Sequence, residues 1–251
     1  MSNKPFGALI IHGFSGKPVG LQRISPPLEA LGLPCHIPNL KGHSAETPNA
    51  LRGIHWREWM VDGENALLEL LAEVEKVIVI GHSMGGWIAL NLAIDHKENI
   101  DSIIMAAAST RSVSPFGPGG SLHFLAPLIV KLKKKWDMPP VFADSEFITY
   151  GNGYEWVPTE TWLNVFDFMK ATEKRFPEVN TPILILHSKN DSSNSPQGAE
   201  ILYNGISTRN DLKRIVWFEK TEHDMFNDCE RDVVINTVVD YIKERTERRV
   251  D

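Results

Sequence analysis

The sequence predicts an α/β fold in which a mostly parallel sheet of six or seven strands carries helices on both faces. Short apolar runs alternate with longer segments whose apolar residues recur every three or four positions, which is the pattern of strands joined by crossover helices. Two runs, Val77–Ile80 and Ile183–Leu186, are apolar throughout, as expected for parallel strands covered on both faces. At 251 residues, the chain has room for one such core with an insertion.

The elements of this core follow from the hydrophobic pattern, although their ends do not. The strands are expected at Ala8–His12, Cys35–Pro38, Lys76–Gly81, Ser102–Ala107, Pro182–His187 and Lys213–Phe218. The helices that connect and follow them are expected at Leu21–Leu31, Trp56–Val74, Met84–His96, Pro196–Asn204 and Glu230–Glu247.

One long segment interrupts the alternation. Residues 110–176 contain no strong buried-strand run, begin with the Pro- and Gly-rich stretch Ser114–Gly120, and end with a predicted helix at Thr159–Phe176. Long segments of this kind in compact domains tend to be lids or binding elements. We therefore expect a core of residues 1–109 and 177–251 and a cap of residues 110–176. The cap should supply an apolar pocket from its aromatic residues, although many of them could instead form a small core of the cap itself. These residues are Phe116, Phe124, Trp136, Phe142, Phe147, Tyr150, Tyr154, Trp156, Trp162 and Phe166.

The composition excludes several classes of partner. A net charge of −6 disfavours nucleic acid, since phosphate binding requires a concentrated excess of lysine and arginine. No apolar run approaches the ~20 residues of a membrane span and no secretory signal is recognisable, so we expect a cytoplasmic protein without stable membrane insertion. Cys35 and Cys229 have neither disulfide-framework nor metal-ligand spacing, and no metal or other cofactor is predicted. The oligomeric state stays open.

One motif carries the chemistry of a nucleophile. Gly81-His-Ser-Met-Gly85 stands between a predicted strand and a predicted helix, the context in which G-x-S-x-G forms a tight turn that exposes its serine at the carboxyl edge of the sheet. Its glycines let neighbouring backbone approach closely. We therefore expect Ser83 to be a nucleophile, and an incidental serine in a Gly-rich turn is the weaker interpretation.

A serine nucleophile needs a base that is itself oriented by an acid, and in sheets with this motif the acid and then the base follow the serine. His223 follows the last predicted strand at its carboxyl end. By contrast, His96 ends a predicted helix, His123 lies in the cap and His187 ends a predicted strand. The sequence therefore favours His223 as the base.

The same reasoning selects the acid. Asp191 stands just beyond the carboxyl end of the strand Pro182–His187. Asp211 precedes the next strand, at the opposite edge of the sheet, and Asp224 adjoins the base in sequence, which is a poor geometry for holding its ring. Asp191 is therefore expected to accept the Nδ1–H of His223 and to fix its tautomer.

Two backbone N–H groups are expected to bind the carbonyl oxygen of a substrate. One belongs to Met84, directly after the nucleophile, and the other to Phe14 in the loop His12–Gly16 that follows the first strand. A plain strand-ending turn is the alternative interpretation of that loop.

Taken together, these residues resemble a known family. The small bacterial carboxylesterases and monoacylglycerol lipases of the α/β-hydrolase fold share the ordered set His12–Gly16, Lys41-Gly-His43, Gly81–Gly86, Asp191 and Glu222-His223. The resemblance covers nearly the whole chain and implies Ser83, Asp191 and His223 as catalytic residues and Phe14 and Met84 as oxyanion donors.

The chain departs from this family at two places. Ser44 stands where the family usually has Gly, which questions the backbone of that loop. After the acid, the chain reads Ser192–Pro196 where the family commonly has an apolar residue followed by Pro, so the loop is more polar and Asp191 could be better solvated or the pocket wall differently shaped.

These residues predict a serine ester hydrolase that forms an acyl-Ser83 intermediate on a small ester with an apolar acyl chain. Acyl transfer to an alcohol and peracid formation would use the same side chains, and a non-catalytic binding protein on a hydrolase scaffold is a further alternative. Dehalogenase and epoxide hydrolase chemistry is disfavoured, because those relatives have Asp in place of this serine. The segment Leu122–Trp136, apolar and then basic, predicts a lid helix, with weak contact to a lipid surface as the alternative.

Overall fold

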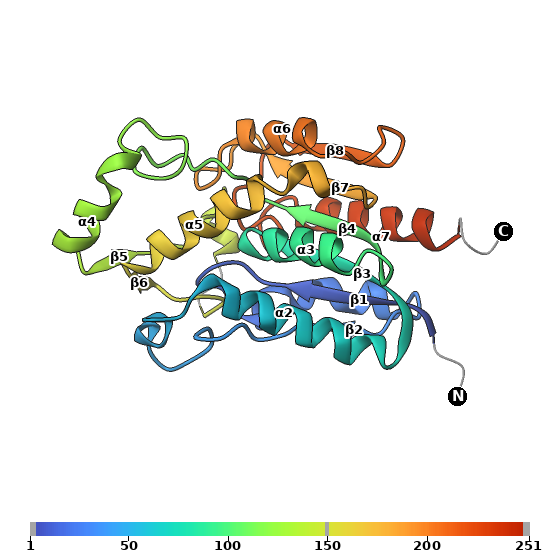
Figure 1. Cartoon of the computed structure of the whole chain (residues 1–251). Helices are drawn as coiled ribbons and strands as arrows, with labels where there is room; N and C mark the ends of the chain where they lie inside the picture. The colour runs from blue at the N-terminus through green and yellow to red at the C-terminus, as the bar shows by residue number, and fades with distance from the viewer. Residues whose placement is uncertain (1–3, 149–150, 248–251) are drawn as a thin grey trace.

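The computed structural model describes residues 4–148 and 151–247, and its centre is a six-stranded sheet. The strand order is β2-β1-β3-β4-β7-β8, and every neighbouring pair is parallel (Figure 1). The strands are β1 (Lys4–Ile11), β2 (Cys35–His36), β3 (Val74–His82), β4 (Ile100–Ala106), β7 (Ile183–Ser188) and β8 (Lys213–Phe218). The prediction of a parallel sheet is confirmed, with the smaller of the two expected strand numbers.

The strand order determines where a ligand can bind. The chain passes from β1 outward to β2, and then crosses to β3 on the other side of β1 before continuing outward to β8. In open α/β sheets, ligands bind in the crevice outside the carboxyl ends of the strands at such a reversal. Because Ser83 directly follows β3, this order brings the serine motif to the crevice.

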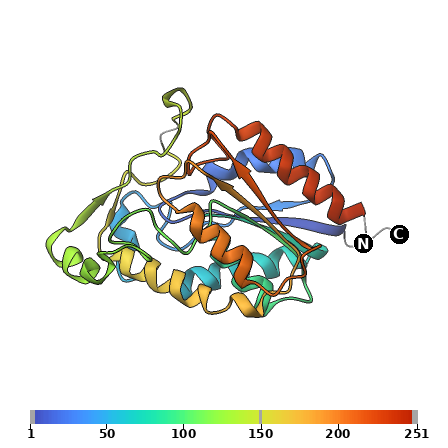
Figure 2. The same ribbon diagram turned by 90° about the horizontal axis from the view of Figure 1, so that it is seen from above.

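Helices cover both faces of the sheet (Figure 2). One face carries α2 (Trp56–Leu71), α3 (Met84–Asp95), α5 (Thr161–Glu173) and α6 (Pro196–Gly205), and the other carries η1 (Pro18–Ile24), α1 (Ser25–Glu29) and α7 (Arg231–Glu247). An apolar core lies on each face of the sheet, and successive residues of β3 contribute to them alternately. Val77 and Val79 lie on the face covered by α3, and Ile78 and Ile80 lie on the face covered by α7. All four side chains are fully buried, which explains why the run is apolar at every position.

Two of the predicted crossover helices are clearly shorter in the structure. The range Leu21–Leu31 is divided between a 3-10 turn and α1, and Pro26 lies in the first turn of α1, where its missing N–H needs no partner. The predicted helix Trp56–Val74 ends at Leu71, because Val74 already pairs with β1 as the first residue of β3.

The segment 110–176 crosses the carboxyl ends of the sheet strands (Figures 1 and 2). It contains α4 (Ala126–Leu132), the antiparallel pair β5 (Lys135–Asp137) and β6 (Trp156–Pro158), and α5, which is shorter than the predicted Thr159–Phe176. Its division from the core as a cap stays a prediction, since Phe168 of α5 is fully buried in the core and stacks on Trp56 at 4.9 Å. Tyr150 lies outside the described residues.

Short 3-10 turns complete the chain at η2 (Pro48–Leu51), η3 (His123–Leu125), η4 (Ser145–Phe147) and η5 (Phe176–Glu178). Within the described ranges, no helix combines the length and the apolar character that crossing a bilayer requires.

Candidate active site

Ser83 occupies a strained turn between β3 and α3. Its backbone has φ 52° and ψ −121°, which lies in a region that residues other than glycine rarely adopt. The turn is possible only because the flanking residues lack side chains: a Cβ on Gly81 would lie 2.2 Å from the oxygen of Gly85, and a Cβ on Gly85 would lie 2.1 Å from the oxygen of Ile11. The expected strand, turn and helix around the motif are all present.

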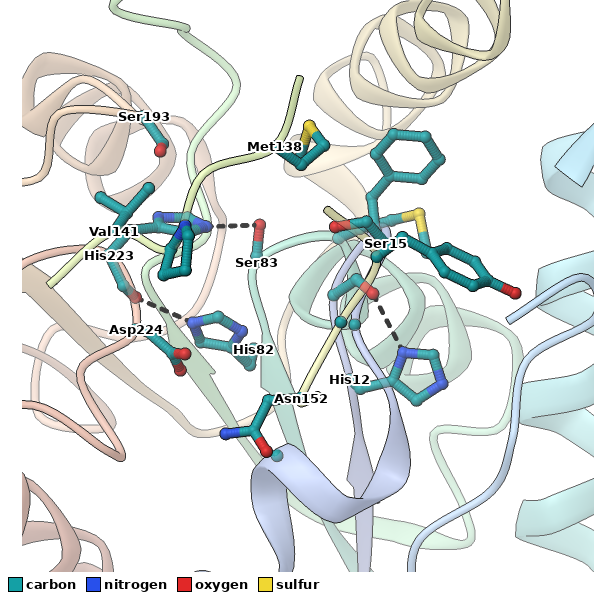
Figure 3. Close-up of a pocket in the computed structure, with 18 of the residues that line it drawn as sticks. His12, Ser15, His82, Ser83, Met138, Val141, Asn152, Ser193, His223 and Asp224 are labelled. Atoms are coloured by element: carbon teal, nitrogen blue, oxygen red, sulfur yellow. Dashed lines mark hydrogen bonds between the residues drawn. The ribbon is translucent and has the colours of Figure 1, made fainter. Parts of the chain in front are cut away.

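His223 and Asp191 meet Ser83 at the carboxyl edge of the sheet. His223 lies in the loop after β8, with its Nε2 3.1 Å from the Ser83 Oγ (Figure 3). Its Nδ1 is 2.9 Å from Oδ2 and 3.1 Å from Oδ1 of Asp191, which follows β7. Since an ionised carboxylate only accepts hydrogen bonds, Nδ1 carries the proton and Nε2 presents its lone pair to the hydroxyl. The structure thus brings together the three side chains predicted from the sequence.

Asp191 is held as a buried carboxylate. The residue is 4% exposed, and Oδ1 also accepts hydrogen bonds from the main-chain N–H groups of Ser193, at 2.9 Å, and Asn194, at 2.8 Å. Burial opposes the charge, but the adjacent His223 and the amide of Asn194 outweigh it and keep the pKa of Asp191 below its ordinary value. The polar loop after the acid therefore does not solvate Asp191, because its own main chain turns inward to the carboxylate.

The electrostatics of His223 follow from the same contact. Burial opposes the imidazolium form, but the carboxylate of Asp191 outweighs it and raises the pKa of His223 above its ordinary value. The negative charges of Asp224 and Glu222 act in the same direction. The ring is thus poised to accept a proton from a neighbouring hydroxyl.

The two predicted oxyanion donors lie at the ends of neighbouring strands. Met84 is the first residue of α3, so its N–H has no acceptor within the helix and lies at the positive end of the helix dipole. Phe14 follows β1 in a loop that His12 holds, since Nδ1 of His12 donates to the oxygen of Gly13 at 3.0 Å and Nε2 accepts from Leu40 N–H at 3.3 Å. Burial lowers the pKa of His12 to about 4, so that this ring is a neutral, structural group.

The loop with the first departure from the family keeps a left-handed backbone. Ser44 has φ 63°, a conformation that glycine adopts more easily. The phenol of Tyr154 supports the loop, since it donates to the oxygen of Gly42 at 2.9 Å and accepts from Ala45 N–H at 2.9 Å. The serine therefore follows the backbone path expected for glycine.

The other histidines considered from the sequence have other partners. His96 bonds to Glu64 at 2.8 Å, and Nδ1 of His123 bonds to the oxygen of Phe116 at 2.9 Å. His187 is fully buried, with Nε2 3.2 Å from the oxygen of Asn194 and 3.7 Å from Oδ2 of Asp191, so it is a second histidine next to the acid.

The two aspartates that were considered as alternatives to Asp191, namely Asp211 and Asp224, also have other partners. Asp211 pairs with Arg209 on the surface, at 2.7 Å. Asp224 lines the cavity in front of His223 but bonds to the amide of Asn227 at 3.1 Å.

Ser83 opens into a cavity of about 220 Å³ between the sheet edge and the segment 110–176. An adjoining cavity of about 320 Å³ shares part of the wall, including Met138, Trp162 and Phe166. The second cavity is lined mainly by apolar side chains, among them Ile129 of α4 and Trp136 of β5. The predicted aromatic wall is thus partly realised, since Phe124, by contrast, is 74% exposed.

One residue near the serine was not predicted to have a role. His82 precedes Ser83 in the motif and lines the cavity, and its Nε2 is 2.9 Å from the main-chain oxygen of His223. The only signal in the sequence was its place between Gly81 and the serine, which gives no hint of a partner 141 residues further along the chain.

A serine on a strained strand–helix turn, bonded to a histidine that is bonded to an aspartate, defines the serine hydrolases of the α/β-hydrolase fold. The family described as serine aminopeptidase S33 (Hydrolase_4) matches residues 7–230, and the chain belongs to this family.

Two relatives from Bacillus match almost the whole chain. A thermostable monoacylglycerol lipase of Bacillus sp. (strain H-257) is 26% identical over 241 residues, which cover 95% of this chain and 91% of the relative. A carboxylesterase of Bacillus subtilis (strain 168) is 24% identical over 237 residues, which cover 94% and 91%.

Solved structures show the same fold. One of the metagenome-derived lipolytic enzymes LipS and LipT superposes with a TM-score of 0.86 at 21% identity, covering 96% of this chain and 95% of the other. The monoacylglycerol lipase of Paleococcus ferrophilus superposes with a TM-score of 0.78 at 18% identity, covering 97% and 96%.

Proposed function

We propose that this serine hydrolase cleaves carboxylic esters through an acyl-Ser83 intermediate. Ser83 Oγ attacks the ester carbonyl while His223 Nε2 takes its proton, and the N–H groups of Phe14 and Met84 receive the oxyanion. The intermediate collapses to the acyl-enzyme as His223 protonates the leaving alcohol. Water, activated by the same ring, then releases the acid and restores the serine.

The observation that carries this proposal is the continuous relay from Asp191 to His223 to Ser83, at 2.9 and 3.1 Å. Its direction is fixed by the carboxylate, which obliges Nδ1 to hold the proton and leaves Nε2 as the base. The strained turn exposes the hydroxyl to the cavity rather than to the core.

The apolar second cavity supports an ester with an apolar acyl chain as the substrate. Its walls offer few groups to a charged ligand, and it lies beside the cavity in front of the serine, with Met138, Trp162 and Phe166 lining both. A monoacylglycerol or a short-to-medium acyl ester has this chemistry, and both relatives from Bacillus carry names of this kind.

A rate profile tests the proposal. We expect the chain to hydrolyse p-nitrophenyl esters of increasing length and monoacylglycerols, with Ser83→Ala as the blank, and to form a fluorophosphonate adduct on Ser83. Folded protein without an adduct would instead support a binding protein. Competition between water and an added alcohol, or hydrogen peroxide, separates hydrolysis from acyl transfer and peracid formation.

The same protein should touch lipid surfaces only weakly, through the outer side of η3 and α4. Phe124, Leu128 and Leu132 are 74%, 52% and 75% exposed, and exposed lysines follow at 131 and 133–135. Apolar side chains beside cationic ones favour an anionic bilayer, but one short patch binds weakly. Cosedimentation with phosphatidylglycerol vesicles should exceed that with phosphatidylcholine and should fall for Leu132→Ser, and equal binding to both vesicles would contradict this contact.

A cytoplasmic location also remains a proposal. It is supported by Cys35 and Cys229, both of which are free thiols in the structure.

A further inference from the structure

His82 links the nucleophile to the loop of the base. It is the last residue of β3 and the neighbour of Ser83, and its Nε2 lies 2.9 Å from the main-chain oxygen of His223 (Figure 3). A carbonyl oxygen can only accept, so Nε2 carries a hydrogen and the imidazole is the donor. The bond therefore joins the residue beside the nucleophile to the main chain of the base itself.

The opposite edge of the same ring faces the oxyanion loop. A Cβ on Gly13 would lie 3.4 Å from Nδ1 of His82, 3.2 Å from its main-chain oxygen and 2.9 Å from the Cβ of Ser83. The absence of a side chain at Gly13 lets the loop that carries Phe14 approach this closely. His82 is thus packed between the loop of the base and the loop of the oxyanion donor.

Other bonds hold the residues on both sides of His223, including one from Asp224 N–H to the oxygen of Val141 at 3.4 Å, while the main-chain oxygen of His223 accepts from His82. Glu230 accepts from the N–H groups of Lys220, at 2.9 Å, and Thr221, at 2.8 Å. Asp228 accepts from the N–H of Glu222 at 2.7 Å. These carboxylates fix the approach to the loop, whereas the ring of His82 contacts residue 223.

The environment keeps His82 neutral. Burial lowers the pKa of this ring, and the neighbouring His223, whose ring centre is 5.1 Å away, lowers it further, against the opposing effect of Asp224. The edge of Phe226 packs at 6.0 Å. A neutral donor at this place adds no repulsion to the imidazolium that forms on His223 during the reaction.

We propose that His82 is a positioning residue that sets the distance between Ser83 and His223 by holding the main-chain oxygen of residue 223. The inference rests on the proposed ester hydrolysis and adds a determinant to it. Without the hydrogen bond from His82, the main-chain oxygen of His223 loses its donor. The ring of His223 can then move away from the hydroxyl of Ser83.

Two variants separate positioning from packing. His82→Phe keeps an aromatic ring but has no donor, and His82→Gln keeps an amide donor at similar reach. With a p-nitrophenyl ester, we expect kcat of His82→Phe to fall about 10- to 100-fold with KM changed less than about twofold, since a misplacement of ~1 Å in an active site can cost about 100-fold. His82→Gln should recover activity to within about fivefold of wild type.

Control measurements make the test decisive. Thermal unfolding identifies the folded variants, and His36→Phe, on the partly exposed edge strand β2, should keep wild-type kcat. The rate of fluorophosphonate labelling at Ser83 should fall in parallel with kcat in His82→Phe and recover in His82→Gln. The acidic limb of the pH profile should also shift to lower pH in His82→Phe. A displaced His223 loses part of its contact with Asp191, and this contact raises the pKa of His223.

The results for these variants distinguish a failure of the role of His82 from a failure of the proposed function. Wild-type labelling and turnover in folded His82→Phe, or a His82→Gln variant no faster than His82→Phe, would overturn the role of His82 and leave the proposed function intact. A wild-type protein that labels at Ser83 but cleaves no ester would instead refute the substrate class, and the labelling rates would still test His82.

Discussion

Around Ser83, polar side chains are buried and bonded to the main chain of the core. By contrast, residues 110–148 and 151–158, here called the covering segment, expose large apolar side chains and line most of an apolar cavity. Asp191 is 4% exposed and accepts from two amides as well as from His223. In the covering segment, Phe124 and Leu132 are each about three-quarters exposed, and Ile129 lines the second cavity.

The two regions therefore have different roles in the proposed function. Ser83, Asp191 and His223 follow the carboxyl ends of parallel strands, whose registers leave little freedom, so we expect the core to determine the reaction. The covering segment contacts the core at a few places, such as the buried Val157 and the isolated bridge between Ser112 and Asn194, and its side chains form most of the wall of the second cavity. Substrate range should therefore change with this segment while the chemistry does not.

Ser83→Ala is the strongest way to test the role of the core. Removing the nucleophile should lower kcat by about 10⁴-fold or more, because no other group forms the acyl-enzyme. Ester hydrolysis by the purified variant measures the loss, and Ser121→Ala, on the exposed surface of the covering segment, should keep wild-type activity. More than a few per cent activity in Ser83→Ala would contradict the assignment.

Asp191→Asn should lower kcat nearly as much as Ser83→Ala does. An amide can donate to Nδ1 of His223 and so favour the wrong tautomer, and losses of about 10³- to 10⁴-fold in kcat are expected from such a change. Asp211→Asn is the matched control, since that carboxylate pairs with Arg209 on the surface. Comparable activity of the two variants would show that Asp191 is not the acid.

The pH dependence of activity tests the electrostatics of the same edge. In the proposed mechanism, only the neutral ring of His223 can accept the serine proton. Burial lowers the pKa of this ring, but Asp191 outweighs burial and raises the pKa above its ordinary 6.5. Its titratable neighbours are Asp191, Glu222, Asp224, His82 and His187. The acidic limb of kcat/KM should therefore lie above pH 6.5, with activity falling about tenfold per unit below it. A limb below pH 6.5 would be inconsistent with this contact.

Ile129→Trp should give the smallest effect and should act on substrate range alone. Ile129 lines the second cavity from α4, and a larger ring there fills part of its volume of about 320 Å³. We expect kcat/KM for long-chain esters to fall about tenfold relative to short-chain esters, since losing a few buried methylene contacts at ~0.8 kcal/mol each is enough. Leu128→Trp, at an exposed position of the same helix, is the control. Equal losses for short and long esters would place the acyl chain elsewhere.

From the sequence alone, the parallel sheet and the meeting of Ser83, Asp191 and His223 could be predicted. Continuous apolar runs indicated strands buried on both faces, and Asp191 and His223 were recognisable because each follows the carboxyl end of a predicted strand by a few residues. Since the carboxyl ends of parallel strands share one edge, order along the chain was enough to predict proximity to Ser83.

How these groups are held, and what covers them, became apparent only in the folded structure. The bond from His82 to the main chain of His223, the burial of Phe168 with the core and the two adjoining cavities all depend on packing between segments far apart in the chain. Local periodicity specifies which face of an element is apolar, but not which distant side chain fills a given space. For this reason the proximity of the three side chains could be predicted from their positions in the chain, whereas the contacts that hold His223 and the shape of the pocket could not.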